Sequence, residues 1–290
     1  MSADSYRLSN LLHSPGLHTD KVLTHLNRVL ATSAGVEATL CTLCYTLYFV
    51  HSRLLRIRKT KHSPLAITLA TKVSTLILPG ETLVASISPP KSYLSGTCAS
   101  VKALADLTND VRYFTRLWGL IPIYNWAKDH YLKPPGDASL KALIWGQVLM
   151  FSTFQVLENG AYLASKGILK GEAWHRRQPK WWVWSNRFCL AYLGLEGLRL
   201  LRIRQLRYNE DFGAKNTTSD EDEGMVRIES EALRRKWQSE FYVGAGWLPL
   251  TLQRSFGDQS AGPLDETWIG ICGMIPGIIA LGNVWQQTKE

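Results

Sequence analysis

The sequence predicts an all-α fold: a membrane-associated helical protein with amphipathic helices and a C-terminal transmembrane helix. Apolar residues recur at three- and four-residue steps over long stretches, which is the spacing of one face of a helix. Residues 267–285 hold no charged side chain, and a helix of that length approaches the thickness of a bilayer core. The eleven tryptophans also favour a membrane protein, because Trp is enriched at membrane–water interfaces.

Changes in composition divide the 290 residues into four regions. Residues 1–90 contain N-terminal amphipathic and apolar helices and a basic cluster. Residues 91–209 contain a long amphipathic helix and a central helical region. Residues 210–239 include a run of acids and are predicted to form a disordered linker. Residues 240–290 form the C-terminal membrane segment.

The first region predicts one long helix that ends near residue 50, or two helices with a bend near Gly35. Its charge-free part, residues 38–50, would span about 20 Å, which is short of a bilayer core of roughly 30 Å. A basic cluster then follows without any acid: Arg53, Arg56, Arg58 and Lys59. Such a cluster is typical of headgroup binding on the cytosolic side of a membrane, and a solvated helix end is the alternative.

An amphipathic helix is predicted over residues 101–128. Its apolar residues form one stripe: Leu104, Leu107, Val111, Phe114, Trp118 and Ile121. We predict that this stripe is a membrane-inserting face and that Arg112 and Arg116 bind lipid headgroups beside it. An ordinary core helix has the same pattern, so this alternative stays open. Pro122 is expected to end the helix.

Two stretches of the central region are further candidates for membrane contact. Residues 142–157 carry no charge and would span about 24 Å as a helix, so the pattern fits both a buried helix and a re-entrant or full span. Residues 174–184, expected as a loop, combine four tryptophans with basic residues. This combination suits a headgroup layer, and Arg176 and Arg177 are predicted to bind headgroups. RNA stacking is the competing interpretation, but no folded RNA-binding motif accompanies it.

The C-terminal segment gives the firmest membrane signal. Trp268 and Trp285 bracket the charge-free run about 25 Å apart, as interfacial aromatics bracket a span. Gly270, Gly273 and Gly277 share one helix face and are predicted to pack against another helix, because small residues allow close approach. A buried core helix is the alternative.

Several functional classes lack their sequence patterns. The net charge of +9 suits nucleic acid or anionic lipid, but zinc-finger spacing, a single-strand RNA signature and basic-zipper heptads are absent. Motifs of nucleotide-binding loops, serine hydrolases and zinc proteases are also absent. Glu158 and Glu196 interrupt apolar runs and are expected to cap a helix or form ion pairs, with a proton or solute path as the alternative. The sequence therefore predicts no enzyme, catalytic residue, metal, cofactor or nucleic-acid partner.

Four segments follow one another along the chain: TDKVLTHL, NDVRYFTRLWGLIPIYNWAK, FQVLENGAYLASKGIL and GWLPLTLQRSF, the last before the Gly-rich apolar segment. In this order and spacing the chain resembles the peroxin-11 family of peroxisomal membrane proteins, in particular its fungal C-type branch. The resemblance covers most of the chain except the acidic linker. The matching positions are Asp20, Lys21 and Leu23; Asp110, Arg112, Arg116, Leu117 and Gly119; and Leu157, Glu158, Asn159, Tyr162 and Leu163. Two departures are an extension around residues 31–37 and the acidic residues within 210–231.

The resemblance implies an integral peroxisomal membrane protein that remodels and elongates the membrane and so promotes peroxisome proliferation and fission. The implied partners are the anionic lipid membrane, further copies of the chain, a dynamin-related fission GTPase with its tail-anchored adaptor, and the import receptor for peroxisomal membrane proteins. The basic segments would face the cytosol. Two alternatives stay open: a peroxisomal solute channel lined by polar residues of 142–157, and a helical membrane scaffold that recruits fission factors.

Overall fold

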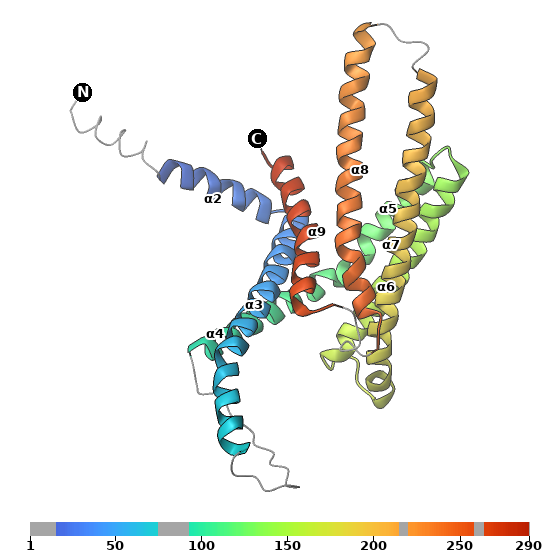
Figure 1. Ribbon diagram of the computed structural model, residues 1–290. Coiled ribbons are helices and arrows are strands. Elements are labelled where there is room, and N and C mark those ends of the chain that lie inside the picture. The colour runs from blue at the N-terminus through green and yellow to red at the C-terminus, as the bar shows by residue number, and fades with distance from the viewer. Residues whose placement is uncertain (1–15, 75–92, 215–219, 258–263, 290) are drawn as a thin grey trace, which may run out of the picture.

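The computed structural model describes residues 16–74, 93–214, 220–257 and 264–289 (Figure 1). Over these residues the chain is helical and has no strand, which confirms the predicted all-α fold. The elements are α2 (Gly16–Leu30), α3 (Ser33–Ser74), α4 (Tyr93–Thr115), the 3-10 helix η1 (Arg116–Trp118), α5 (Leu120–Leu132), α6 (Ala138–Ser165), α7 (Glu172–Ala214), α8 (Asp220–Arg254) and α9 (Glu266–Gln287). Parts of the predicted regions, including 1–15, 75–92 and 215–219, lie outside the described residues.

The helices form a ring of neighbouring pairs. α3 packs against both α4 and α9, α9 packs against α8, α8 against α7, and α7 against α6. η1 follows α4 and contacts α6, so it closes the ring. Figure 1 shows α7 and α8 as a long hairpin, while α2 extends away from the other helices.

The N-terminal helix α2 is attached to the end of α9. His25 Nε2 lies 3.1 Å from the carbonyl oxygen of Trp285 and 3.0 Å from Thr288 Oγ1. α2 and α3 are separate because Thr32 Oγ1 accepts a hydrogen bond from the Gly35 amide at 3.0 Å, as a capping residue does. The break predicted near Gly35 thus lies slightly earlier, between the end of α2 and the start of α3.

Three helices are long and apolar enough to cross a membrane, by length and composition and among the described residues: Ser33–Thr60 within α3, Ala138–Ser165 and Glu266–Gln287. The predicted C-terminal transmembrane helix is one of them. The charge-free runs in α3 and α6 are shorter than a bilayer, but both helices continue beyond these runs. α6, with 28 residues, is about 42 Å long and can span. Most side chains in the apolar windows of the three helices are not buried inside the protein.

Two predicted boundaries are wrong. The loop predicted at 174–184 is helical and belongs to α7, which continues through Pro179. The amphipathic helix does not end at Pro122: α4 ends at Thr115, and Pro122 lies in the first turn of α5. Pro fits there because the first amides of a helix have no intrahelical acceptor.

The disordered linker predicted at 210–239 is also wrong where the structure describes it. α7 continues to Ala214, and α8 already begins at Asp220. The acidic run at 220–223 comes in the first turn of α8, where the helix dipole favours negative charge. Farther along, α8 is fixed to α7, because Trp237 Nε1 donates a hydrogen bond to the carbonyl of Leu200 at 2.9 Å.

The glycine face of α9 packs against α3. Gly270, Gly273 and Gly277 are all buried. A Cβ atom on Gly270 would lie 2.8 Å from the Cβ of Phe49, and one on Gly277 would lie 2.8 Å from Thr42 Oγ1. Such distances are below van der Waals contact, so the two helices approach this closely only because these positions are glycines. The face predicted to pack against another helix therefore does so within the same chain.

Candidate membrane-binding surface and polar cavity

The apolar stripe predicted as a membrane-inserting face lies on the outside of the protein. All six of its residues are exposed, with exposed fractions from 39% for Val111 to 60% for Leu107. Phe114 and Trp118 contact each other edge to face, with ring centroids 5.4 Å apart. The described part of the chain does not cover this face, so the alternative of an ordinary core helix does not hold for it.

The polar side of α4 faces the neighbouring helix α3. Tyr48 Oη donates a hydrogen bond to Asp106 Oδ1 at 3.1 Å, and Lys102 Nζ lies 3.0 Å from the same carboxylate. The Cys44 thiol lies 3.7 Å from the carbonyl of Ala105. A surface helix of a soluble protein turns its apolar side inward. α4 has the reverse orientation, so its apolar side has no partner among the described residues.

Arg112 does not face lipid headgroups, so this prediction is wrong. Its side chain is 2% exposed, and its Nε and Nη2 atoms both donate to Glu37 Oε1 at 3.1 Å. The guanidinium also lies over the rings of Tyr45 and Trp247, 5.3 and 5.9 Å from their centroids. A buried charge is tolerated only with a close partner of opposite charge, and α3 supplies that partner.

Arg116 is also turned inward, so the headgroup prediction is wrong for it as well. Its Nη2 atom lies 3.2 Å from Glu158 Oε1 on α6. Its guanidinium lies 4.8 Å from the ring centroid of Tyr113. The Glu158 side chain is 8% exposed, and its role as an ion-pair partner is the one expected from the sequence.

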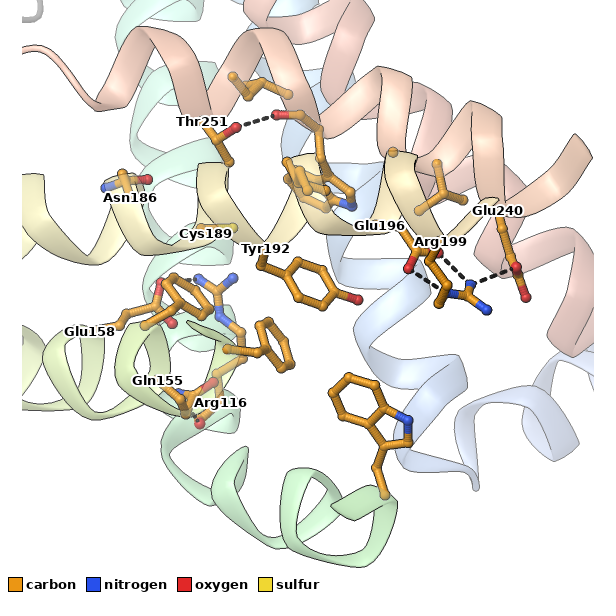
Figure 2. A pocket seen from close by; sticks show the side chains of 18 of the residues that line it. Arg116, Gln155, Glu158, Asn186, Cys189, Tyr192, Glu196, Arg199, Glu240 and Thr251 are labelled. Carbon is orange, nitrogen blue, oxygen red and sulfur yellow. Dashed lines mark hydrogen bonds and ion pairs between the residues drawn. The ribbon is translucent and has the colours of Figure 1, made fainter. Parts of the chain in front are cut away.

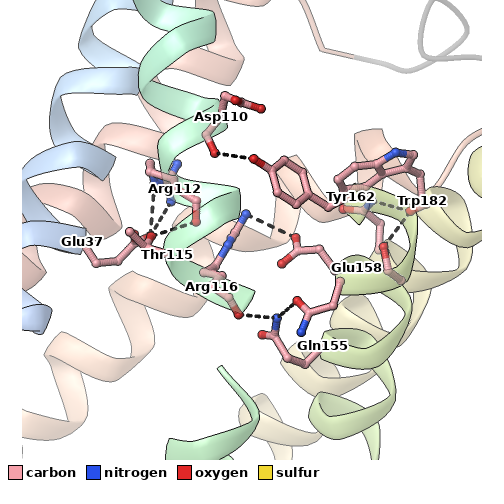
Figure 3. Close-up of polar contacts among 12 residues, drawn as sticks. Glu37, Asp110, Arg112, Thr115, Arg116, Gln155, Glu158, Tyr162 and Trp182 are labelled. Atoms are coloured by element: carbon pink, nitrogen blue, oxygen red, sulfur yellow. Dashed lines mark hydrogen bonds and ion pairs between the residues drawn. The ribbon is translucent and has the colours of Figure 1, made fainter. Parts of the chain in front are cut away.

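Side chains of α6 also bind the end of α4 and η1 (Figure 3). Gln155 Nε2 donates to the carbonyl of Arg116 at 2.9 Å, and Asn159 Nδ2 donates to the carbonyl of Leu117 at 3.0 Å. The last carbonyls of a helix have no intrahelical donor, so these amides satisfy them. The contacts join two segments that carry the family resemblance, NDVRYFTRLWGLIPIYNWAK and FQVLENGAYLASKGIL.

Arg112→Ala is expected to destabilise the protein without weakening its binding to anionic liposomes. Removing Arg112 leaves the Glu37 carboxylate without its counter-ion, and because Glu37 is 36% exposed, the cost is expected to stay below the roughly 3–5 kcal/mol of a fully buried pair. The measurement is thermal unfolding in detergent, alongside liposome flotation with the folded fraction. A loss of flotation with unchanged thermal stability would restore the headgroup role.

The other basic residues predicted to bind headgroups are accessible. The exposed ones are Arg53, Arg56, Lys59, Arg176 and Arg177, and Arg58 is half-buried. The guanidinium of Arg177 lies over the ring of Trp174, 5.7 Å from its centroid. Figure 1 shows the later part of α3 and the start of α7 toward the lower end of the view. The headgroup prediction for these six residues stays a prediction.

A cavity of about 750 Å³ lies between η1, α5, α6, α7, α8 and α9 (Figure 2). Its wall combines aromatic rings with charged groups. Arg199 Nη2 lies 2.6 Å from Glu196 Oε1 and 2.9 Å from Glu240 Oε2, so one guanidinium holds two carboxylates. Gln147 Nε2 donates to the other oxygen of Glu196 at 2.6 Å. Glu196 therefore forms an ion pair, as expected.

Glu196 is expected to make the stability of the protein depend on acid pH. Burial by itself raises the pKa of this carboxyl, but the hydrogen bonds and charge of Arg199 hold the pKa below its ordinary value. A carboxyl with a lowered folded-state pKa stabilises the fold fully above the ordinary glutamate pKa of about 4.3. It loses this effect as the pH falls through the lower value.

The measurement is the melting temperature of the wild type and of Glu196→Gln, taken from about pH 7 down to about pH 3. The gap between the two proteins should close in the acid range. Glu231→Gln, at an exposed position with a long 3.9 Å ion pair to Arg235, is the control and should show no such gap. A gap for Glu196→Gln that stays constant with pH would contradict the prediction.

Sequence reasoning misses Glu37, Trp247 and Arg254, which lie near the inward-facing side of α4 or line the cavity. Glu37 is charged at the edge of an apolar run, as Glu158 is, and this is the signal that could have indicated it. Trp247 and Arg254 carry no comparable local signal, because their neighbours come from distant parts of the chain.

Comparison of the chain with family models, with curated proteins and with solved structures finds no match. The fold and the surfaces define its class. It is an all-helical protein with three helices that fit a membrane protein, an apolar stripe that faces outward, and a polar cavity between the helices.

Proposed function

We propose that this chain is a peroxisomal membrane protein that elongates the membrane through its amphipathic surface and self-association, and so promotes peroxisome proliferation and fission. The observation that carries the proposal is the exposed apolar stripe on α4, η1 and the start of α5. Large exposed apolar patches mark interaction sites. The same chain contains three helices of membrane-spanning length, so the bilayer that they would cross is the apolar partner we expect for the stripe.

The mechanism follows from the position of α4 beside α3. Their polar contacts lie between Glu37 and Tyr48, which is the first half of the candidate span Ser33–Thr60. α4 therefore adds width to this span in one half of the bilayer more than in the other. An apolar wedge in one leaflet expands that leaflet and favours curvature. Ion pairs from α4 to Glu37 and from η1 to Glu158 fix this segment to two candidate spans, so the wedge is rigid.

The proposed partners rest on different grounds. Anionic lipid is supported by the exposed basic residues of α3 and α7. Self-association needs a surface other than the glycines of α9, because these pack against α3. Exposed leucines of α7, Leu198 and Leu201, are available for it. The peroxisomal location, the fission GTPase with its adaptor and the import receptor rest on the family resemblance alone.

The test is expression of the tagged full-length chain together with a peroxisomal marker, followed by alkaline carbonate extraction and protease protection. The proposal expects co-localisation, elongated or more numerous peroxisomes, and resistance to carbonate. Release by carbonate would favour the alternative of a peripheral scaffold that recruits fission factors. Localisation of the tagged chain to a different organelle would refute the peroxisomal part of the proposal. Membrane remodelling would then be tested separately with liposomes.

The cavity favours a second candidate function, a solute channel. Gln155 and Glu158 of the candidate span α6 are buried and line it. Polar residues within a span that face a cavity are typical of solute paths. Single-channel conductance of the purified chain in planar bilayers would support this function, whereas tubulation without conductance supports remodelling alone.

A further inference from the structure

Arg254, at the C-terminal end of α8, lines the cavity between η1, α5, α6, α7, α8 and α9. No hydrogen bond or ion pair joins its guanidinium to another described residue, whereas the other arginines of the cavity are paired. Arg116 holds Glu158, and Arg199 holds Glu196 and Glu240. Glu158 keeps one oxygen, Oε2, buried and without a hydrogen-bond partner. The described wall still carries four cations, Arg116, Arg199, Lys236 and Arg254, against three carboxylates, and Arg254 forms no ion pair with any of these three.

Arg254 also lies where two cavities meet. Together with Asn186 it lines a second cavity of about 410 Å³, between α3, α4, α7 and the end of α8. A second guanidinium donor in the larger cavity is unsatisfied as well, because Arg116 Nε is buried and has no acceptor. Buried donors normally have an acceptor. The free Nε of Arg116 and the guanidinium of Arg254 therefore give this cavity donors that suit an anion.

The rest of the wall is suited to an apolar group. Phe151, Phe154, Leu193 and Leu250 line the same cavity. Phe151 stacks with Phe154 and Tyr192, with ring centroids 5.5 and 4.8 Å apart, so this part of the wall is ordered. A volume of about 750 Å³ falls within the range of about 300–1,000 Å³ of small-molecule pockets. The cavity is larger than a bare inorganic ion requires.

We propose that this cavity binds a phosphorylated amphiphile, with its phosphate on the guanidinium of Arg254 and its apolar part against Phe151, Phe154 and Leu193. The planar guanidinium fork matches two phosphate oxygens, and the free Nε of Arg116 is available as a further donor. The ligand enters either from the surrounding bilayer, as an anionic lipid, or from solution. The proposed site does not depend on membrane remodelling or on the organelle.

The test uses the full-length chain in phosphatidylcholine nanodiscs, with dodecyl phosphate as the probe and dodecanol as its uncharged counterpart. Dodecyl phosphate is expected to bind and to raise the melting temperature, and dodecanol is not. Arg254→Met should weaken binding about tenfold or more, because a charge-assisted hydrogen-bonded contact is lost. The melting temperature of each variant without probe is measured alongside, because the charge of Arg254 also acts on the buried Glu158 carboxylate. Arg235→Met, at an exposed position of the same helix, should bind like the wild type.

Equal binding of dodecyl phosphate by the wild type and Arg254→Met would overturn the proposal, as would an absence of binding by the wild type. If Arg254→Met does not fold, Arg254→Lys replaces it. Lysine keeps the charge but lacks the fork, so several-fold weaker binding is expected and unchanged affinity would overturn the proposal. Nanodiscs that contain phosphatidic acid separate the two sources. Loss of dodecyl phosphate binding there identifies a membrane lipid as the occupant, and unchanged binding identifies a soluble ligand.

Discussion

Full-length protein with Val111→Asp and Phe114→Asp is expected to lose the ability to tubulate anionic liposomes while keeping its helical fold. Both side chains are exposed, so the substitutions remove no buried contact. A carboxylate in the hydrocarbon part of a bilayer costs roughly 2.5–3.5 kcal/mol even where it can reach water. Two carboxylates on one stripe should therefore prevent its insertion. The measurements are electron microscopy of the liposomes and circular dichroism of the purified variant.

The matched control carries Val111→Leu and Phe114→Leu. It changes the same two exposed positions without adding charge, and it should tubulate like the wild type. Tubulation by the aspartate variant would refute the role of the stripe. Loss of tubulation in the leucine variant would show that the added charge is not the cause.

Gly273→Leu is expected to separate α9 from α3 and to cause a large loss of stability. Gly273 is buried, and the ring of Tyr45 occupies the space where a side chain would start. Overpacking of a tight site costs about 1–3 kcal/mol, and more where the obstacle is a ring held in a core. Tyr45 is such a ring, because it is 1% exposed and packs on Trp247 with centroids 5.8 Å apart. The melting temperature should fall by roughly 5–10 °C.

Gly282→Leu provides the control on the same helix. Gly282 is exposed, and a Cβ atom there meets nothing within 4 Å. This variant should unfold within about 2 °C of the wild type, since surface substitutions usually change stability by less than about 0.5 kcal/mol. Equal melting temperatures for both leucine variants would show that the packing of α9 on α3 contributes little to stability.

The apolar stripe of α4 and the two arginines beside it show what a sequence pattern can predict and what it cannot. The apolar stripe of α4 was predictable, because a helical period fixes which side chains share a face whatever lies beside them. The direction in which that face points was open between core and membrane. The exposure of Val111 and Trp118 decides for the outside of the protein. Arg112 and Arg116 lie beside the stripe in the sequence pattern, yet both are turned inward.

The acidic segment illustrates a different limit. A run of acids beside polar residues has the composition of a disordered linker. Composition does not record that the run begins a helix whose later part packs against α7 through Trp237. Most helical stability in proteins comes from such packing rather than from local propensity. The cavity could not be predicted from the sequence for the same reason, since its wall combines residues of six separate elements.

By itself, the sequence determined the all-helical class, the C-terminal helix of membrane-spanning length, the apolar stripe and the glycine face, because each depends on spacing within one segment. Only the tertiary structure decided what each face meets: α3 for the glycines, the exterior for the stripe, and Glu37 and Glu158 for the two arginines. An arginine at the edge of a helix gives the same local pattern whether its partner is a lipid phosphate or a carboxylate from a distant helix. Glu37 and Arg112 are 75 residues apart, and the fold alone brings them together.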